Sequence, residues 1–268
     1  MRVLWAAALS ALPAIAAADE VDRLLEALQI GEVVQILVEE GSATALALED
    51  SMFPGRGGDA WASEVRRIYE WETREAALDG EMRRRLEGRN LAPLLAFLEG
   101  DVGQRIMALE VSARRAFIEP EMEEIALELF EDAEDTQPVL HAQVMEFTEV
   151  NDLVGQNVEG AFESNAAFAL GVHTAGGFDG VSLNALIAQL WAGDEAVEAD
   201  VSSWLYAYLM TAYRPLPEED LAAYIALSKT ADGQMLNTVI MASFNALFSD
   251  ISYDLGSAAG RFMAQQEL

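Results

Sequence analysis

The sequence contains the stretch NLAPLLAFLEGDVGQRIMALEVSARRAFI at Asn90–Ile118 and a related stretch, DLAAYIALSKTADGQMLNTVIMASFNALF, at Asp220–Phe248. They align without a gap, and six of their 29 positions are identical. A weaker pair lies upstream of each, where Leu24–Glu40 aligns with Val144–Gly160. A repeat of this length indicates that one supersecondary unit occurs twice in the chain. We therefore expect two copies of one fold that pack together.

Both stretches have the periodicity of amphipathic helices. In the later one, Leu236, Val239, Ser243 and Leu247 follow the three-to-four spacing of a buried helical face. No stretch shows the sustained alternation of β-branched residues that is typical of strands. The sequence therefore predicts an all-α fold, built as two tandem helical-bundle repeats of similar topology.

The domain boundaries follow from the repeat. We expect a leader over residues 1–18, a first repeat over 19–119, an acidic junction helix and turn over 120–140, and a second repeat over 141–268. The expected apolar side of the junction helix consists of Met122, Ile125, Leu129 and Phe130.

Helix starts also correspond between the copies. Gly31 aligns with Asn151 and Asn90 aligns with Asp220, and all four residue types are suited to an N-cap. We expect these four residues to begin helices.

The N-terminus has the features of a secretory leader. Arg2 precedes the apolar run Val3–Ile15, and Ala16–Ala18 supplies the small residues that a signal peptidase reads. We expect cleavage after Ala18, export to a bacterial periplasm, and no transmembrane segment in the mature chain; an uncleaved anchor is the alternative. The chain has no cysteine, which excludes disulfides, thiol nucleophiles and thiolate metal sites.

The chain is strongly acidic. It has 46 Asp and Glu against 16 Lys and Arg, a formal net charge of −30. Only three basic residues, Arg214, Lys229 and Arg261, follow Glu119. Such a field repels nucleic acid and anionic membrane surfaces. Adaptation to salt explains it most simply, and recognition of a cation or of a basic partner is the alternative.

The segments NLAPLLAFLEGDVGQRIM and EEDLAAYIALSKTADGQML share a capped acidic start, a short helix, a Gly-Gln pair and an amphipathic helix. This pattern resembles the family called domain of unknown function 2059, which consists of exported, all-helical bacterial proteins. The resemblance covers about residues 188–249 and is looser in the first copy. It departs from the family where members often carry an aromatic pair, at Leu227-Ser228 and Phe97-Leu98. The resemblance implies fold and compartment, and it implies no activity.

Two groups of residues are candidates for ligand contact. Trp204 and Tyr208 lie on one helical face and are candidates for an apolar groove, with burial in the core as the alternative. Arg84 and Arg85 belong to the one basic cluster, with Arg83. This cluster is expected either to pair with the acidic second half or to bind a phosphate or lipid head group.

Other motifs favour structural roles. The repeated pairs Gly103-Gln104 and Gly233-Gln234 are interpreted as a close helix contact with a glutamine bonded to an open helix turn, and an anion site at a helix start is the alternative.

The two histidines, His141 and His173, do not have the spacing of a catalytic zinc site. We expect no catalytic residues, no metal and no cofactor.

These observations rank three functions. The first is a non-catalytic binding or interaction protein of the cell envelope, with an apolar small molecule or another protein as its partner. The second is a structural or chaperone-like bundle without a ligand. The third is a carboxylate-dependent hydrolase, which would place a histidine beside a buried carboxylate in a cleft.

Overall fold

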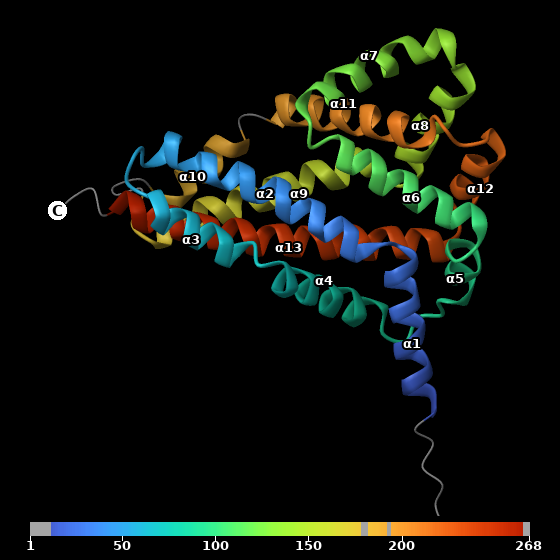
Figure 1. Ribbon diagram of the computed structural model, residues 1–268, viewed down its shortest axis with the longest axis horizontal. Helices are drawn as coiled ribbons and strands as arrows, with labels where there is room; N and C mark the ends of the chain where they lie inside the picture. Colours follow the sequence, from blue (N-terminus) through green and yellow to red (C-terminus); the bar gives the residue numbers. More distant parts are fainter. Residues whose placement is uncertain (1–11, 178–181, 192–193, 265–268) are drawn as a thin grey trace, which may run out of the picture.

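The computed structural model describes residues 12–177, 182–191 and 194–264, and every regular element in these ranges is an α-helix (Figure 1). In chain order the helices are α1 (Leu12–Ala27), α2 (Ile30–Met52), α3 (Gly58–Ile68), α4 (Trp71–Leu86), α5 (Ala92–Leu98), α6 (Asp101–Ala116), α7 (Pro120–Thr136), α8 (Pro138–Val150), α9 (Leu153–Thr174), α10 (Leu183–Trp191), α11 (Asp194–Tyr213), α12 (Glu218–Ser228) and α13 (Ala231–Ala264). The prediction of an all-α fold is confirmed. Residues 1–11 of the expected leader lie outside the described residues, and α1 continues through Ala18.

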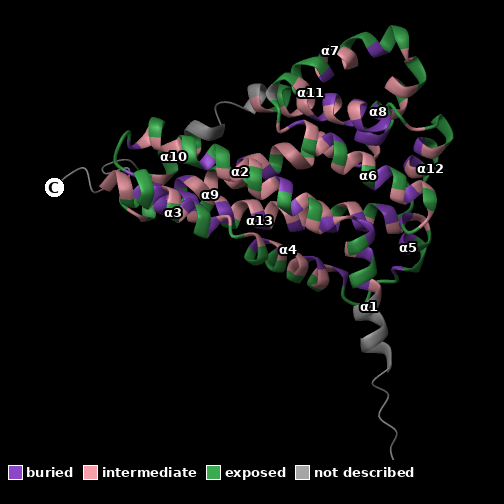
Figure 2. Ribbon diagram, viewed as in Figure 1, coloured by how far each residue is buried: buried purple, intermediate pink, exposed green. Residues whose placement is uncertain are grey.

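The long helix α13 organises the body of the molecule. It packs mainly along α9, and it also contacts α2, α3, α4, α5 and α12 (Figure 1). Helix α11 forms a second centre, where it packs against α6, α7, α8 and α9. Buried residues lie on the inward faces of these helices (Figure 2).

The two halves of the chain pack against each other through several helices. Helix α4 of the first half packs against α13 of the second, and α11 of the second half packs against α6 of the first. One hydrophobic cluster accordingly includes buried residues of α1 to α8 and of α11 to α13, and partly buried residues of α9 pack against it. The two halves therefore share a single core.

Glycines allow α9 and α13 to pack closely. A Cβ atom on Gly256 would lie 2.1 Å from the carbonyl oxygen of Phe168, and one on Gly171 would lie 2.4 Å from the carbonyl oxygen of Tyr253. These distances are below van der Waals contact, so larger residues at either position would push the two helices apart. The close contact fixes α13 against α9 along its C-terminal half.

The predicted N-caps at Gly31 and Asn151 are wrong. The chain instead breaks at Gln29 and Asp152, which adopt left-handed conformations with φ of 53° and 48°. Gly31 lies inside α2, and Asn151 precedes the break. The predicted alignment pairs Gln29 with Glu149, so the observed break at Asp152 lies three residues further along the chain. A shift of three residues nearly preserves the phase of a helix, so the apolar pattern did not reveal the error.

The later caps behave differently from each other. The Asn90 side chain accepts a hydrogen bond from the Ala92 amide at 3.3 Å, but the N-cap of α5 is Leu91, so Asn90 lies one residue before the capping position. Asp220 does not cap α12, because that helix begins two residues earlier, behind Pro217. Its carboxylate instead forms an ion pair with Arg105 of the first half at 2.5 Å.

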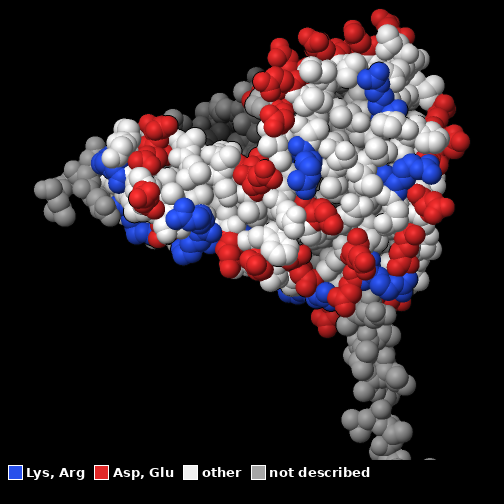
Figure 3. Space-filling view, viewed as in Figure 1, with Lys and Arg blue, Asp and Glu red and all other residues white. Residues whose placement is uncertain are grey.

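The junction helix α7 exists, and its apolar side agrees with the predicted one in part: Phe130 packs against the core, and Met122 and Leu129 are half-buried. Ala126 and Ala133 are buried, whereas Ile125 is 49% exposed. Small residues are needed there because α11 packs large aromatic rings against α7; Tyr206, for example, stacks on Phe130 at 4.9 Å. Figure 3 shows acidic side chains along the outer edge of α7, which faces solvent.

Candidate binding site

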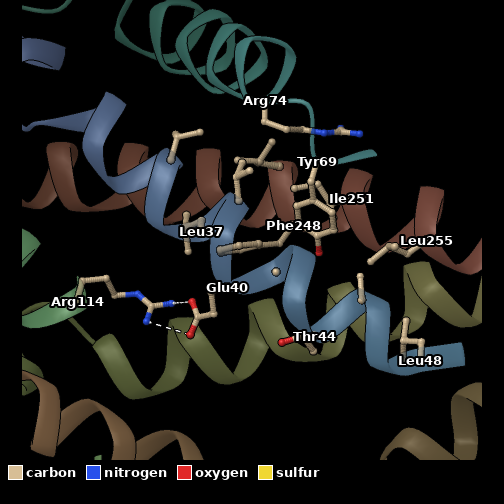
Figure 4. Close-up of a pocket in the computed structure, with 15 residues that line it drawn as sticks. Leu37, Glu40, Thr44, Leu48, Tyr69, Arg74, Arg114, Phe248, Ile251 and Leu255 are labelled. Atoms are coloured by element: carbon tan, nitrogen blue, oxygen red, sulfur yellow. Dashed lines mark hydrogen bonds and ion pairs between the residues drawn. The ribbon is translucent and has the colours of Figure 1, made fainter. Parts of the chain in front are cut away.

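A mainly apolar cavity of about 240 Å³ opens between α2 and α13 (Figure 4). Its walls consist largely of aliphatic side chains from one face of α2 and one face of α13, with the Phe248 ring between them. The apolar residues that line it are Val34, Leu37, Val38, Ala45, Leu48, Leu247, Phe248, Ile251 and Leu255. An apolar cavity with a few polar groups at its edges is the usual form of a small-molecule site.

Tyr69, in the connection between α3 and α4, forms part of the wall. Its ring lies against Gly41 of α2, where a Cβ atom would come within 2.4 Å of the ring and 2.8 Å of the hydroxyl oxygen. Glycine is therefore required at position 41 for the ring to occupy this place. Burial raises the pKa of the Tyr69 hydroxyl to about 12, an effect that nearby Arg74 opposes and Glu40 increases.

Two arginines reach the cavity, and each is paired with a carboxylate. Arg114 of α6 donates two hydrogen bonds to Glu40 of α2, one of them at 3.2 Å (Figure 4). Arg74 of α4 is buried, with an exposed fraction of 8%. It donates to the Ile68 carbonyl and pairs with Asp254 of α13 at 3.0 Å. Both pairs join helices that are distant in the sequence, so they also brace the cavity.

Arg114 separates this cavity from a second one. Its guanidinium carbon lies 5.1 Å from the centre of the Trp204 ring, and Trp204 lines a wider cavity of about 740 Å³ between α7, α9, α11 and α13. Phe248 lines both cavities. The second cavity is more polar, since carboxylate, amide and hydroxyl side chains line it together with Trp204.

The predicted candidates Trp204 and Tyr208 lie together on α11. Their rings stack at 5.2 Å, and Phe117 packs edge-on against both. The Tyr208 hydroxyl donates to the Glu110 carbonyl at 3.2 Å, and the residue does not line either cavity. Tyr208 therefore packs in the core, and Trp204 contributes to the second cavity while Arg114 and Tyr208 pack against its ring.

The predicted candidates Arg84 and Arg85 lie elsewhere, on α4. Both pair with Glu81 of the same helix, at 2.6 and 2.7 Å. Arg83 pairs with Asp79 and Asp22. The hypothesis that this basic cluster contacts the acidic second half is therefore wrong, because carboxylates within the first half are nearer.

Other arginines make the contacts between the halves. Arg74 pairs with Asp254, Arg105 with Asp220, and Arg261 approaches Glu64 at 3.6 Å. Ion pairs therefore do connect the two halves, as the unequal charges predict, but they involve Arg74, Arg105 and Arg261 and not the cluster of Arg83, Arg84 and Arg85.

A partly buried acid, Glu110 of α6, lies beside Tyr213 of α11. The Glu110 carboxylate accepts a hydrogen bond from the Tyr213 hydroxyl at 2.7 Å. Burial raises the pKa of Glu110 to about 7, although the bond from Tyr213 opposes this effect. Burial also raises the pKa values of Tyr208, Tyr213 and Tyr224, and the charge of Glu110 adds to the effect.

The repeated Gly-Gln pairs have the predicted structural role. A Cβ atom on Gly103 would lie 2.3 Å from the Phe97 carbonyl oxygen, and one on Gly233 would lie 2.1 Å from the Leu227 carbonyl oxygen. Gln104 donates to the carbonyls at the ends of α1 and α5, and Gln234 donates to those at the ends of α8 and α12. Each glutamine thus satisfies two open helix ends, and the packing interpretation is confirmed.

The histidines do not form a site with a carboxylate among the described residues. His141 stacks on Phe130 at 5.1 Å. The Nδ1 atom of His173 is buried and has no hydrogen-bond partner in the described part of the chain. The contact expected of a carboxylate-dependent hydrolase is therefore not found in these ranges.

The polar residues of the cavity were not among the predicted candidates. Glu40 is one of many acids, and its partner Arg114 lies 74 positions away, so composition did not distinguish either residue. The one local signal was Gly41 within an otherwise regular amphipathic segment, since a glycine inside a helix often marks a close approach.

Comparison with protein-family models, with curated proteins and with solved structures finds no match to this chain. None of the described helices is both long and apolar enough to cross a bilayer. Within the described residues no three or more acidic or histidine side chains are arranged to hold a metal ion.

Proposed function

We propose that this protein is an exported, periplasmic binding protein of the cell envelope, which holds an apolar small molecule in the cavity between α2 and α13. The observation that carries the proposal is the cavity itself, whose lining is mostly aliphatic and whose polar groups lie at its edges. Removing an alkyl chain from water into such a cavity is favourable by roughly 25 cal/mol for each Å² of apolar surface buried.

The location of the cavity supports a binding role. Its walls come from α2 and α13, two helices that pack in one bundle, and pockets occur preferentially between the helices of bundles. The ion pair Glu40–Arg114 joins α2 to α6, and Arg74–Asp254 joins α13 to α4, so each wall is held by a neighbouring helix. A site of this kind is largely formed before the ligand arrives.

The sequence is the basis for three further proposals, which concern the internal repeat, the related family and export. We propose that the chain consists of two tandem copies of similar topology, and that it is related to domain of unknown function 2059. The matching roles of Gln104 and Gln234 and the reciprocal packing of α4 and α11 support the first idea. The leader ending at Ala18 supports export.

The cavity can be tested with N-phenylnaphthylamine, an uncharged probe whose fluorescence rises in apolar surroundings. Thr44 lies at the exposed mouth of the cavity, and neighbouring Ala43 is exposed but does not line it. Thr44→Trp should fill the mouth, and Ala43→Trp is the matched control. We expect saturable binding to the wild type and to the control, and an affinity loss of at least about tenfold, or 1.4 kcal/mol, in Thr44→Trp.

Equal probe binding by all three proteins, with unchanged melting temperatures, would contradict the proposal. The same conclusion would follow if the wild type did not bind the probe saturably.

A further inference from the structure

We propose that the cavity between α2 and α13 selects uncharged amphiphiles that carry a hydrogen-bonding oxygen, such as a medium-chain alcohol or ester, over anionic and cationic amphiphiles of the same chain. This inference rests on the proposed function, because it names the class of ligand for the same cavity. Three features carry it: the pairing of the charged groups, the hydroxyl of Tyr69 and the size of the apolar wall.

Every charged side chain that lines the cavity already has a partner of opposite charge. Glu40 and Arg114 neutralise each other, with side-chain exposed fractions of 34% and 17%. Arg74, which is 10% exposed at its side chain, is neutralised by Asp254. A charged head group would therefore enter without a free counter-charge, and burying an unpaired charge is costly.

Displacement of Glu40 by a ligand carboxylate would not remove this difficulty. The exchange would replace one carboxylate on Arg114 by another and would leave the Glu40 carboxylate beside the new anion. The protein also carries a formal net charge of −30, which repels anions as they approach. The arrangement thus disfavours anionic ligands.

The Tyr69 hydroxyl is a polar group that remains available inside the cavity, and the Thr44 hydroxyl is another at the exposed mouth. The hydroxyl of Tyr69 lines the cavity, it points into the space beside α2 in Figure 4, and it has no hydrogen-bond partner among the described residues. Because its pKa is about 12, it stays neutral and can both donate and accept at physiological pH. Its contact with Gly41 fixes the ring, so the hydroxyl has a defined position.

The volume of the cavity limits the ligand. About 240 Å³ is slightly below the roughly 300–1,000 Å³ of typical drug-sized sites. A single alkyl chain of medium length fits this space better than a steroid or a two-chain lipid.

The test compares ligands that share a ten-carbon chain but differ in head group. Decanol, methyl decanoate, decanoate and decyltrimethylammonium compete with N-phenylnaphthylamine for the wild-type protein and for Tyr69→Phe. High salt suppresses attraction of the cation to the acidic surface. Tyr253→Phe is the matched control, because Tyr253 is exposed and does not line the cavity.

We expect decanol and methyl decanoate to compete about tenfold more strongly than decanoate and the ammonium compound. Tyr69→Phe should weaken the two uncharged ligands by between about twofold and tenfold, the effect of one hydrogen bond, and Tyr253→Phe should change nothing. Binding of the probe itself, which needs no such bond, should survive in Tyr69→Phe.

The results that would overturn this inference differ from those that would overturn the proposed function. Strongest competition by decanoate, or equal affinities in wild type and Tyr69→Phe, would overturn this inference while leaving a ligand cavity in place. Absence of saturable probe binding, or its insensitivity to Thr44→Trp, would overturn the proposed function as well.

Discussion

Glu110 should make the stability of this protein depend on pH. Its folded-state pKa is raised to about 7 from an ordinary value of 4.5, with burial as the main cause. For an acid with a raised pKa, the native state binds more protons than the unfolded state between the two values. Stability therefore falls as pH rises from 4.5 through 7.

The magnitude follows from linkage. A shift from 4.5 to about 7 corresponds to a loss of about 2.5 kcal/mol between pH 5 and pH 8. Glu110 as a whole retains some exposure, and solvent screens part of this effect, so we expect about 2 kcal/mol. Glu110→Gln removes the ionisation and keeps the shape.

The assay is urea denaturation of wild type and Glu110→Gln at a series of pH values. The free energy of unfolding of the variant, relative to the wild type, should rise by about 2 kcal/mol from pH 5 to pH 8. Tyr213→Phe provides an independent check, because the bond from Tyr213 lowers the pKa of Glu110. Removing that bond should raise the pKa of Glu110 further, as measured by NMR of its carboxyl carbon.

A stability difference between wild type and Glu110→Gln that does not change with pH would refute this reasoning. A fall in the Glu110 pKa in Tyr213→Phe would refute the assigned role of the hydrogen bond.

Five further substitutions test the packing by denaturant unfolding. Gly233→Ala places a Cβ atom 2.1 Å from a carbonyl oxygen of α12 and should lower the free energy of unfolding by about 2 kcal/mol. Gly80→Ala, which has open space around it in α4, should raise the free energy of unfolding by up to about 1 kcal/mol. Equal effects of the two substitutions would contradict the close contact at Gly233. Gln104→Leu removes the donor to two helix ends and should cost about 1–3 kcal/mol, so an unchanged free energy of unfolding would count against the capping role. Glu40→Ala should lower the free energy of unfolding more than Arg114→Met does, because Glu40→Ala leaves the mostly buried Arg114 guanidinium without its partner. The reverse order would show that the Arg114 charge does not need Glu40.

The periodic parts of the fold were predictable from the sequence. The all-α class and the close contact at Gly103 and Gly233 followed from spacing and from the repeat. The breaks at Gln29 and Asp152 were misplaced, because a shift of three residues leaves nearly the same apolar face inward.

The site was not predictable to the same degree. Its polar groups are joined by tertiary contacts, such as Arg74–Asp254 across 180 positions, and a single acidic sequence offers many equivalent carboxylates. Trp204 was a reasonable candidate by residue type, yet the cavity that it lines adjoins the apolar one rather than forming it. Which arginine meets which carboxylate is decided by the packing of α4, α6 and α13.

We expect the cavity between α2 and α13 to hold an apolar, uncharged small molecule in the native protein. Native mass spectrometry of the protein isolated gently from a periplasmic extract tests it most directly, with Thr44→Trp prepared in parallel. We predict an additional mass on the wild-type protein that is released on denaturation, that belongs to an uncharged amphiphile, and that is reduced in Thr44→Trp. A bare mass for both proteins, or the same bound mass on both, would contradict the claim.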